Sequence, residues 1–423
     1  MSARQPPPLL QLSELVPQEA VKHIEAAHEA LFVPTQQTAA LLECFVACAR
    51  AHSESLYSDP KLVGAHLMAK TLPGGAYLPM CLTGLAGTGK SALLEALMRV
   101  LATPSSGDAG GAVHRFALQA AAMVRLRKLV SNTELFKTFI NAIGPGLYAC
   151  PTPDKELAHK LYAYAVCLAV ADEFQFVSGS AQANVRAVQI LMLLSTLRVP
   201  QVYAVNYSMC HRLMARPQEE RDRVFSHVLL LRPELPETLD WSKTVTGYRN
   251  LLPNEFEKLT VEELASTMYP LTFGLKRQLG KLIRLAYLAM RQDGRNQFSL
   301  AHFDKAYRST AYAAVREDVH LLLQQAVTNS PIRADLRCPF PEIEDKKTRV
   351  PSSTQSAFGR VVAKAMAEGQ NSRPSAPAKM APRGHAAPNG TNGGEGNVVS
   401  MEQRRESDLE ASMAVLSQGL KLR

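Results

Sequence analysis

Gly84-Leu-Ala-Gly-Thr-Gly-Lys-Ser91 fits the pattern G-x-x-x-x-G-K-[ST], and this stretch decides the fold. Its glycines allow the backbone to curl so that successive N–H groups face phosphate oxygens. The apolar run Leu78–Thr83 before it predicts a strand. The segment Ser91–Leu101 after it predicts a helix, whose N-terminus favours anions. We therefore predict a phosphate-binding loop in which Lys90 reaches the β- and γ-phosphates and the Ser91 hydroxyl ligates Mg²⁺.

Strand and helix patterns alternate on both sides of this loop. Such alternation is typical of a parallel sheet covered by helices on both faces, which predicts an α/β fold. Further strands are expected at Val113–Leu118, Ala163–Val170, Gln201–Val205 and Val228–Leu231, and further helices at Thr133–Ile143, Lys155–Leu161 and Ala183–Leu197.

Two adjacent carboxylates, Asp172 and Glu173, follow the apolar strand pattern that ends near Val170. A phosphate-loop ATPase needs an acid on the Mg²⁺ shell and usually a base that orients the attacking water. We assign these roles to Asp172 and Glu173 respectively. The alternative is the solvated start of a loop. Without the phosphate loop, that alternative would be the better interpretation.

Asn206 closes the next strand pattern, Gln201–Val205. An amide at this position could reach between Glu173 and the γ-phosphate and hold the attacking water. The alternative is an Asn at an ordinary turn, which is common.

The remaining chain divides by composition. Before the phosphate loop, helices are expected at Pro17–Phe32 and Thr35–Ala51. After Pro233 only helices are expected, at Thr260–Thr267, Leu275–Met290 and Leu300–Ala314. Ser299 is the expected N-cap of the last of them. From about Lys346 the chain has too few large apolar residues to fold. The predicted division is an N-terminal helical extension (1–52), an ATPase core (53–235), a helical lid domain (236–330), a disordered linker (331–400) and a short amphipathic helix (401–423).

Composition narrows the class of protein. The 423 residues are 46% hydrophobic and 20% charged, which excludes wholesale disorder. The longest apolar run, Ala163–Ala171, is too short to span a membrane, and the N-terminus lacks an apolar signal core. The seven scattered cysteines read as reduced core thiols of a cytoplasmic protein. Of the net charge of +9, +6 lies in residues 346–423, so a basic tail follows a nearly neutral body.

The order of these elements resembles that of AAA+ ATPases: a phosphate loop, an Asp-Glu strand end, an Asn strand end, a basic segment and a helical lid. Within that superfamily, the chain is similar to the TnsC/TniB group of transposition regulators, relatives of MuB and IstB, over about residues 30–310. The segments that carry this similarity are Leu31-Phe-Val-Pro34, Arg221-Asp-Arg-Val-Phe225, Gly274-Leu-Lys-Arg277 and Phe298-Ser-Leu-Ala-His-Phe303.

The resemblance implies a role for each matching residue. Asn206 would be the first sensor, Arg277 the second sensor of the lid, and Arg223, or failing it Arg221, an arginine finger that reaches a neighbouring subunit's nucleotide. Solvation alone also accounts for an Arg on a helix at either position. Gln175 departs from the pattern, since related proteins often carry His there. The nucleotide-binding residues would be Gly84, Leu85, Ala86, Gly87, Thr88, Gly89, Lys90 and Ser91, with Asp172 and Ser91 serving Mg²⁺.

A basic cluster, Arg125, Arg127 and Lys128, would face DNA in the channel of the oligomer. Phosphate contacts of this kind are independent of base sequence, and the alternative is a solvated helix face. The implied function is an ATP-dependent regulator that assembles as a ring or filament on duplex DNA in the cytoplasm or nucleoid, marks a target and recruits a transposase and a target selector. The alternatives are a replication initiator or helicase loader, and a nucleotide-switched scaffold that does not act on DNA.

Overall fold

A computed structural model describes residues 6–69, 72–102, 119–126, 132–143, 152–174, 183–328, 330 and 332–340. All of them belong to one compact unit, Met1–Ser372. The strand expected at Val113–Leu118, most of the predicted linker and the predicted helix at 401–423 lie outside the described residues.

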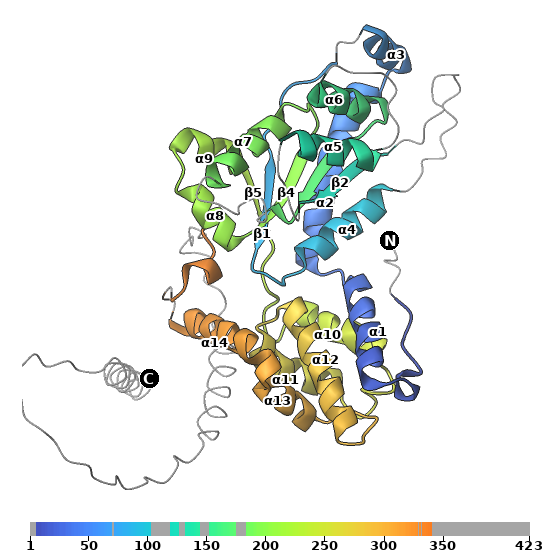
Figure 1. The fold of residues 1–423 in the computed structure, drawn as a ribbon, viewed down its shortest axis with the longest axis vertical. Helices are drawn as coiled ribbons and strands as arrows, with labels where there is room; N and C mark the ends of the chain where they lie inside the picture. The colour runs from blue at the N-terminus through green and yellow to red at the C-terminus, as the bar shows by residue number, and fades with distance from the viewer. Residues whose placement is uncertain are drawn as a thin grey trace, which may run out of the picture. The chain divides into compact units, whose positions relative to one another are not determined.

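In the described residues, five strands form a single parallel sheet, which confirms the predicted fold class (Figure 1). The order across the sheet is β2-β3-β4-β1-β5, so β1, which leads into the phosphate loop, lies between β4 and β5. Every neighbouring pair is parallel, and the carboxyl ends of the strands therefore share one edge. The strands are β1 (Met80–Gly84), β2 (Ala121–Arg125), β3 (Leu168–Asp172), β4 (Gln201–Asn206) and β5 (His227–Leu230).

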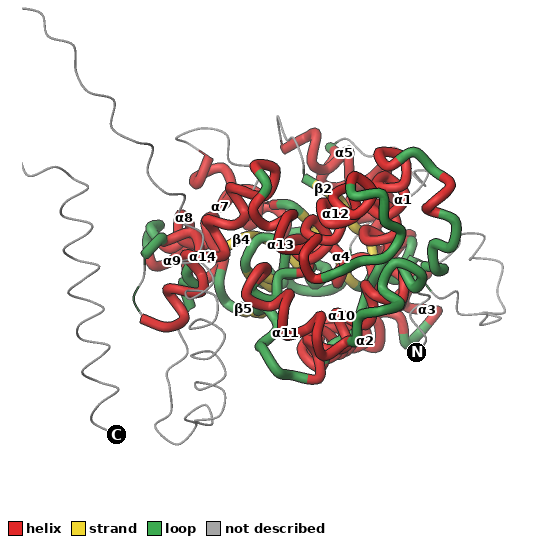
Figure 2. Tube along the Cα trace, turned by 90° about the horizontal axis from the view of Figure 1, so that it is seen from below, coloured by secondary structure: helices red, strands yellow, loops and turns green. Residues whose placement is uncertain are grey.

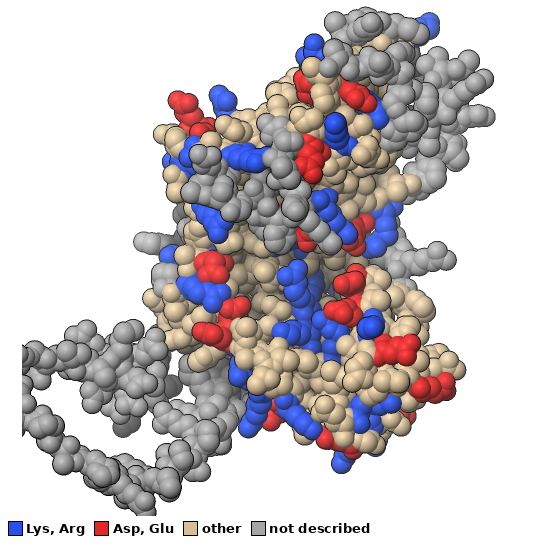
Figure 3. All heavy atoms as spheres, in the orientation of Figure 1, with Lys and Arg blue, Asp and Glu red and all other residues tan. Residues whose placement is uncertain are grey.

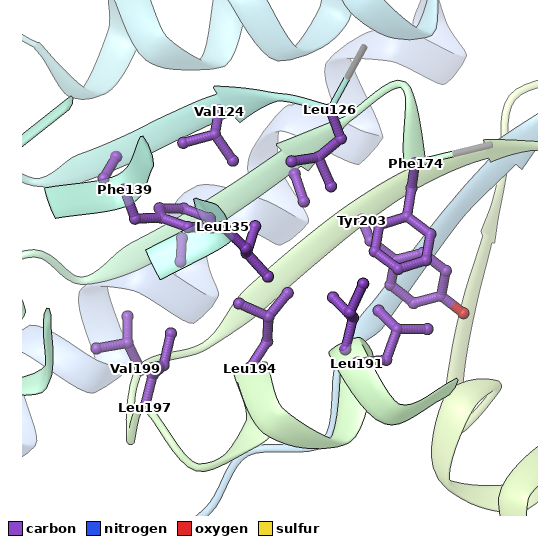
Figure 4. Packing of buried hydrophobic residues seen from close by; sticks show 14 of the residues in the cluster. Val124, Leu126, Leu135, Phe139, Phe174, Leu191, Leu194, Leu197, Val199 and Tyr203 are labelled. Carbon is purple, nitrogen blue, oxygen red and sulfur yellow. The ribbon is translucent and has the colours of Figure 1, made fainter. Parts of the chain in front are cut away.

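Helices cover both faces of the sheet. Alternate side chains of each strand point to opposite faces, and because the central strands β1 and β3 are buried at every position, a core forms on each side. Leu82, Val170 and Val202 pack into one core, together with helices α2 and α4. Cys81 and Tyr203 pack into the other, and Figure 4 shows this core with Leu191 and Leu194 of α7 lying against strand side chains. The helices of this part are α2 (Gln36–Tyr57), α3 (Pro60–Ala69), α4 (Lys90–Leu101), α5 (Asn132–Ile143), α6 (Pro153–Ala163), α7 (Ala183–Ser195), α8 (Tyr207–Met214) and α9 (Gln218–Val224).

Two strand predictions differ from the structure. The apolar run that begins at Ala163 starts as the end of α6, turns at Ala165 (φ 53°) and becomes strand β3 only at Leu168. The run is apolar because the helix end and the turn are buried too, and burial alone does not distinguish strand from helix. Strand β2 was not predicted, since its Ala-rich sequence favours a helix, but parallel pairing with β3 overrides that preference.

A helical part follows the sheet, as predicted, and the described residues after β5 contain no strand. Its core surrounds Trp241, Tyr269 and Tyr287. The N-terminal helix α1 (Pro17–Ala30) shares this core and lies beside α12 in Figures 1 and 2, whereas α2 packs on the sheet. Ser299 is the N-cap residue of α13. The helices are α10 (Leu239–Leu251), α11 (Val261–Thr272), α12 (Lys276–Gln292), α13 (Leu300–Arg308) and α14 (Ala313–Thr328).

Residues 332–340 return from α14 to the sheet-bearing part, which corrects the prediction of a disordered linker at these positions. The backbone oxygen of Arg337 lies 3.0 Å from Nε2 of His211 on α8. The ring of Phe340 packs edge-on against Phe225, with centroids 5.0 Å apart. These contacts attach the segment to the folded part of the chain.

The cysteines only partly match the expected core thiols. Cys81, Cys167 and Cys210 are buried, whereas Cys44 is exposed and Cys48 is half-buried on α2. All described cysteines are free thiols.

Candidate functional site

The phosphate loop connects the end of β1 to the start of α4. Gly87 (φ 92°) and Gly89 (φ 102°) have backbone conformations that side chains disfavour, which explains why glycine occupies them. A Cβ at Gly84 would collide with the backbone oxygen of Leu231, so this glycine allows β1 to pass close to the end of β5. The loop is thus folded as the sequence predicted, with α4 beginning at Lys90.

Lys90 is buried beneath the loop. Its Nζ donates hydrogen bonds to the backbone oxygens of Gly84 (2.8 Å) and Leu85 (2.9 Å). Burial, and to a lesser degree the positive charge of Arg277, lower the pKa of Lys90 to about 7, while the charge of Asp172 opposes this shift. Two backbone carbonyls thereby hold the Lys90 amine at the loop. An anion bound there would favour the charged form of this amine.

We expect the pKa of Lys90 to make stability depend on pH. In the unfolded chain this lysine titrates near 10.5, so between pH 7 and 10.5 the unfolded state holds the additional proton. The free energy of unfolding should therefore rise with pH above about 7, by at most about 1.4 kcal/mol per pH unit. Urea unfolding at pH 7, 8 and 9 measures this slope. The Lys90→Met variant is the control, and its free energy of unfolding should lack the rise with pH that Lys90 contributes. Identical slopes for the two proteins would contradict a lowered pKa of Lys90.

Asp172 and Glu173 lie at the carboxyl end of β3. Asp172 is buried, and its Oδ1 accepts the backbone N–H of Glu173 at 2.8 Å. Glu173 is half-buried and adopts φ 57°, a left-handed conformation that is uncommon for a non-glycine residue. The positive φ turns the chain sharply, so that two successive carboxylates leave the strand at the edge where the phosphate loop also lies.

Asn206 lies beside the phosphate loop. It ends β4 and pairs in register with Gly84, the first residue of the loop. It is also the N-cap residue of α8, but its side chain makes no capping hydrogen bond. The half-buried amide can therefore act on a ligand of the loop.

The helical part brings Arg277 to the same place. The backbone N–H of Arg277 donates to the oxygen of Gly87 at 3.1 Å, and a Cβ at Gly87 would lie 2.9 Å from the Cβ of Arg277. The side chain of Arg277 is exposed. The first turn of α12 thus contacts the phosphate loop directly.

Arg221 and Arg223 lie at the opposite edge of the sheet. Their helix, α9, leads into β5 at His227, which pairs with Met80 at the amino end of β1. The five residues of β1 span about 16 Å and separate this end of the sheet from the phosphate loop. Neither arginine therefore belongs to its own chain's phosphate loop. Arg223 is exposed, whereas Arg221 is half-buried and its Nε makes no hydrogen bond.

Of the predicted DNA-binding cluster, only Arg125 is described. It ends β2, pairs in register with Asp172 and forms an ion pair with Glu95 of α4. Arg127 and Lys128 lie outside the described residues. A surface ion pair of this kind is worth at most about 1 kcal/mol, so a phosphate group could displace Glu95.

No three His, Cys, Asp or Glu side chains in the described parts of the chain are grouped to hold a metal. Ser91 and Asp172 are both oxygen donors at the loop, as Mg²⁺ requires, and Mg²⁺ usually completes its shell with water and phosphate oxygens. The donor set therefore fits Mg²⁺ bound together with a nucleotide.

Sequence reasoning missed two charged residues at this site, Glu234 and Lys276. Glu234 lies between β5 and α10, and Lys276 is the first residue of α12. Lys276 precedes the predicted Arg277, but nothing in the sequence indicates that Glu234 lies next to it.

No protein-family model matches the chain, and no curated protein is similar to it in sequence. Several solved structures are similar in fold. The Aeropyrum pernix ORC2 protein is 11% identical with a TM-score of 0.46, covering 80% of this chain and 96% of that one. The Aeropyrum pernix ORC1 protein in complex with DNA is 17% identical with a TM-score of 0.41, covering 68% of each chain. Domain III of the Thermotoga maritima replication initiation protein DnaA is 14% identical with a TM-score of 0.37, covering 65% of this chain and 92% of that one.

Proposed function

We propose that the protein is an ATPase that assembles on duplex DNA and regulates transposition. The observation that supports ATP chemistry is the meeting of Lys90, Asp172, Glu173, Asn206 and Arg277 at one edge of the sheet. These residues come from two strand ends, the loop helix and the helical part. Each supplies a group that phosphoryl transfer to water needs.

In this proposal the loop amides, Lys90 and Arg277 bind the triphosphate. Mg²⁺, held through Ser91 and Asp172, would neutralise charge on the phosphates. Glu173 accepts a proton from the attacking water, and Asn206 orients that water toward the γ-phosphate. Bringing these groups together in one place supplies the positioning on which phosphoryl transfer depends.

Hydrolysis in this proposal requires a second subunit. Arg223 is exposed and far from its own phosphate loop, so it can serve only a neighbouring subunit's nucleotide. ATP would then favour oligomers, and hydrolysis would loosen them. The oligomer would be a homo-oligomeric ring or filament.

The resemblance of the sequence to the TnsC/TniB group is the basis for two parts of this proposal. They are the action on DNA and the transposase and target selector as partners. Arg125 and the basic tail supply positive charge, and such contacts to phosphate do not depend on base sequence. No described helix has the length and apolar character to cross a membrane.

Electron microscopy of the full chain with duplex DNA tests this function. We expect rings or filaments on DNA with a slowly hydrolysed ATP analogue and none with ADP. Raising the salt concentration should remove them, because phosphate contacts release counterions. Particles that ignore both DNA and nucleotide would contradict the proposal and favour a scaffold. DNA-bound assemblies that fail to stimulate a transposase encoded by a neighbouring gene would favour a replication loader.

A further inference from the structure

Lys276 contacts the phosphate loop, although neither the sequence nor the proposed function assigns it a role. Its Cδ lies 3.3 Å from the position that a Cβ at Gly89 would take. Gly89 is the N-cap residue of α4, where free backbone N–H groups and the helix dipole favour an anion. Figure 3 shows Lys and Arg side chains gathered on this face where the helical and sheet-bearing parts meet.

Glu234 supplies the counter-charge of Lys276. Oε1 of Glu234 lies 3.2 Å from Nζ of Lys276, and the side chains are 8% and 16% exposed. No hydrogen bond reaches this Oε1, which is buried. A carboxylate that leaves water for a single ion pair keeps a large desolvation cost. The pair is therefore one that a better anion can displace.

The backbone holds Glu234 in this position. Gly274, in the turn that leads into α12, has φ 66°, and a Cβ there would collide with the backbone oxygen of Glu234. The segment after β5 consequently lies tightly against the start of α12. Glu234 and Lys276 face each other because of this close approach.

The charges around the loop favour a polyanion. Lys90, Arg277 and Lys276 all contact the loop, and the positive charge of Arg277 already lowers the pKa of Lys90. A triphosphate brings several negative charges to this group of cations. For Lys276, contact with phosphate oxygens would replace its contact with one poorly bonded carboxylate.

We propose that Lys276 is a second polyphosphate-binding lysine and that Glu234 masks it until nucleotide arrives. The inference rests on the proposed nucleotide site. It adds that phosphate displaces the Glu234 carboxylate, so that ATP binding breaks the ion pair between the β5–α10 segment and α12. Nucleotide occupancy thereby changes how the helical part is held.

The test measures dissociation constants of the full chain for Mg²⁺-ATP and for inorganic tripolyphosphate, which has no base or ribose. Glu234→Gln should bind both about tenfold more tightly, because the competing charge is gone. Lys276→Met should bind both about tenfold more weakly. The double variant should behave like Lys276→Met, since Glu234 then has no lysine to mask. Glu234→Ala repeats the first measurement in case Glu234→Gln fails to fold.

A second ion pair, between the C-cap residue of α12 and a lysine of α13, provides matched controls. Nζ of Lys305 lies 2.8 Å from Oδ1 of Asp293, just beyond the far end of the helix and about 25 Å from Lys276. Asp293→Asn and Lys305→Met should leave both dissociation constants unchanged.

Opposite signs for the Glu234 and Lys276 variants support the inference. If both variants weaken binding, or if neither changes it, the pair is structural and the inference is wrong. If tripolyphosphate binding is unaffected while ATP binding changes, Lys276 contacts base or ribose, which also overturns the inference. The Lys90→Met variant tests the nucleotide site itself, and undiminished ATP binding there would remove the proposed function instead.

Discussion

The Glu173→Gln variant should bind ATP like the original chain and hydrolyse it at least about a hundredfold more slowly. The amide has nearly the same size and shape as the carboxylate, but it cannot accept the proton of the attacking water. Gln at this position can follow the same backbone, so the left-handed turn after Asp172 should persist. Steady-state phosphate release and a separate measurement of the dissociation constant for ATP give the two quantities.

Glu262→Gln is the matched control. Glu262 is an exposed carboxylate in the first turn of α11, and its replacement should leave hydrolysis unchanged. Full hydrolysis in the Glu173→Gln variant would show that another group activates the water. Loss of ATP binding in that variant would place Glu173 in nucleotide binding rather than in hydrolysis.

Replacing Arg223 by Ala should lower ATP hydrolysis by about a thousandfold or more, since arginine fingers contribute at least this factor in related chemistry. ATP binding to the separate subunit should not change, because Arg223 lies at the opposite edge of the sheet from its own phosphate loop. Hydrolysis per subunit of the original chain should rise with protein concentration. If hydrolysis per subunit of the original chain does not depend on protein concentration, action between subunits is contradicted.

Mixing two inactive variants tests the same prediction directly. Lys90→Met subunits lack a functional nucleotide site but keep Arg223, whereas Arg223→Ala subunits have the reverse defect. The mixture should recover part of the hydrolysis that neither variant shows alone. Arg221→Ala is the matched comparison. If it, rather than Arg223→Ala, loses activity and is rescued in the mixture, the half-buried arginine is the finger.

Much of the fold was predictable because its signals are local. The phosphate loop needs glycines at fixed spacing, and the structure shows Gly87 and Gly89 with the positive φ values that explain them. The parallel sheet and the helical part were also correctly predicted. The error at Ala163 arose because a buried helix end and turn are as apolar as a strand. The missed strand β2 depends on its partner β3, which its own sequence does not reveal.

Some helices were missed for a similar reason. Helix α10 contributes Trp241 and Tyr248 to a core that it shares with α1 and α12, and its stability comes from this packing. Packing of an amphipathic face supplies most helical stability in proteins, whereas intrinsic propensity contributes little. A local pattern therefore gives only a weak signal where the partner helices lie far away in the chain.

The sequence by itself determined which chemical groups the protein has: a loop shaped for phosphate, a lysine and a serine at its end, and two carboxylates and an amide after buried strands. Their spacing within a few residues carries this information. Only the tertiary structure decided which of them meet. The strand order places Asn206 beside Gly84, and the parallel direction of β5 places Arg223 at the far edge. The return of the helical part brings Lys276 and Glu234 together. Such contacts join residues far apart in the chain, so they follow from strand order and packing rather than from any local pattern.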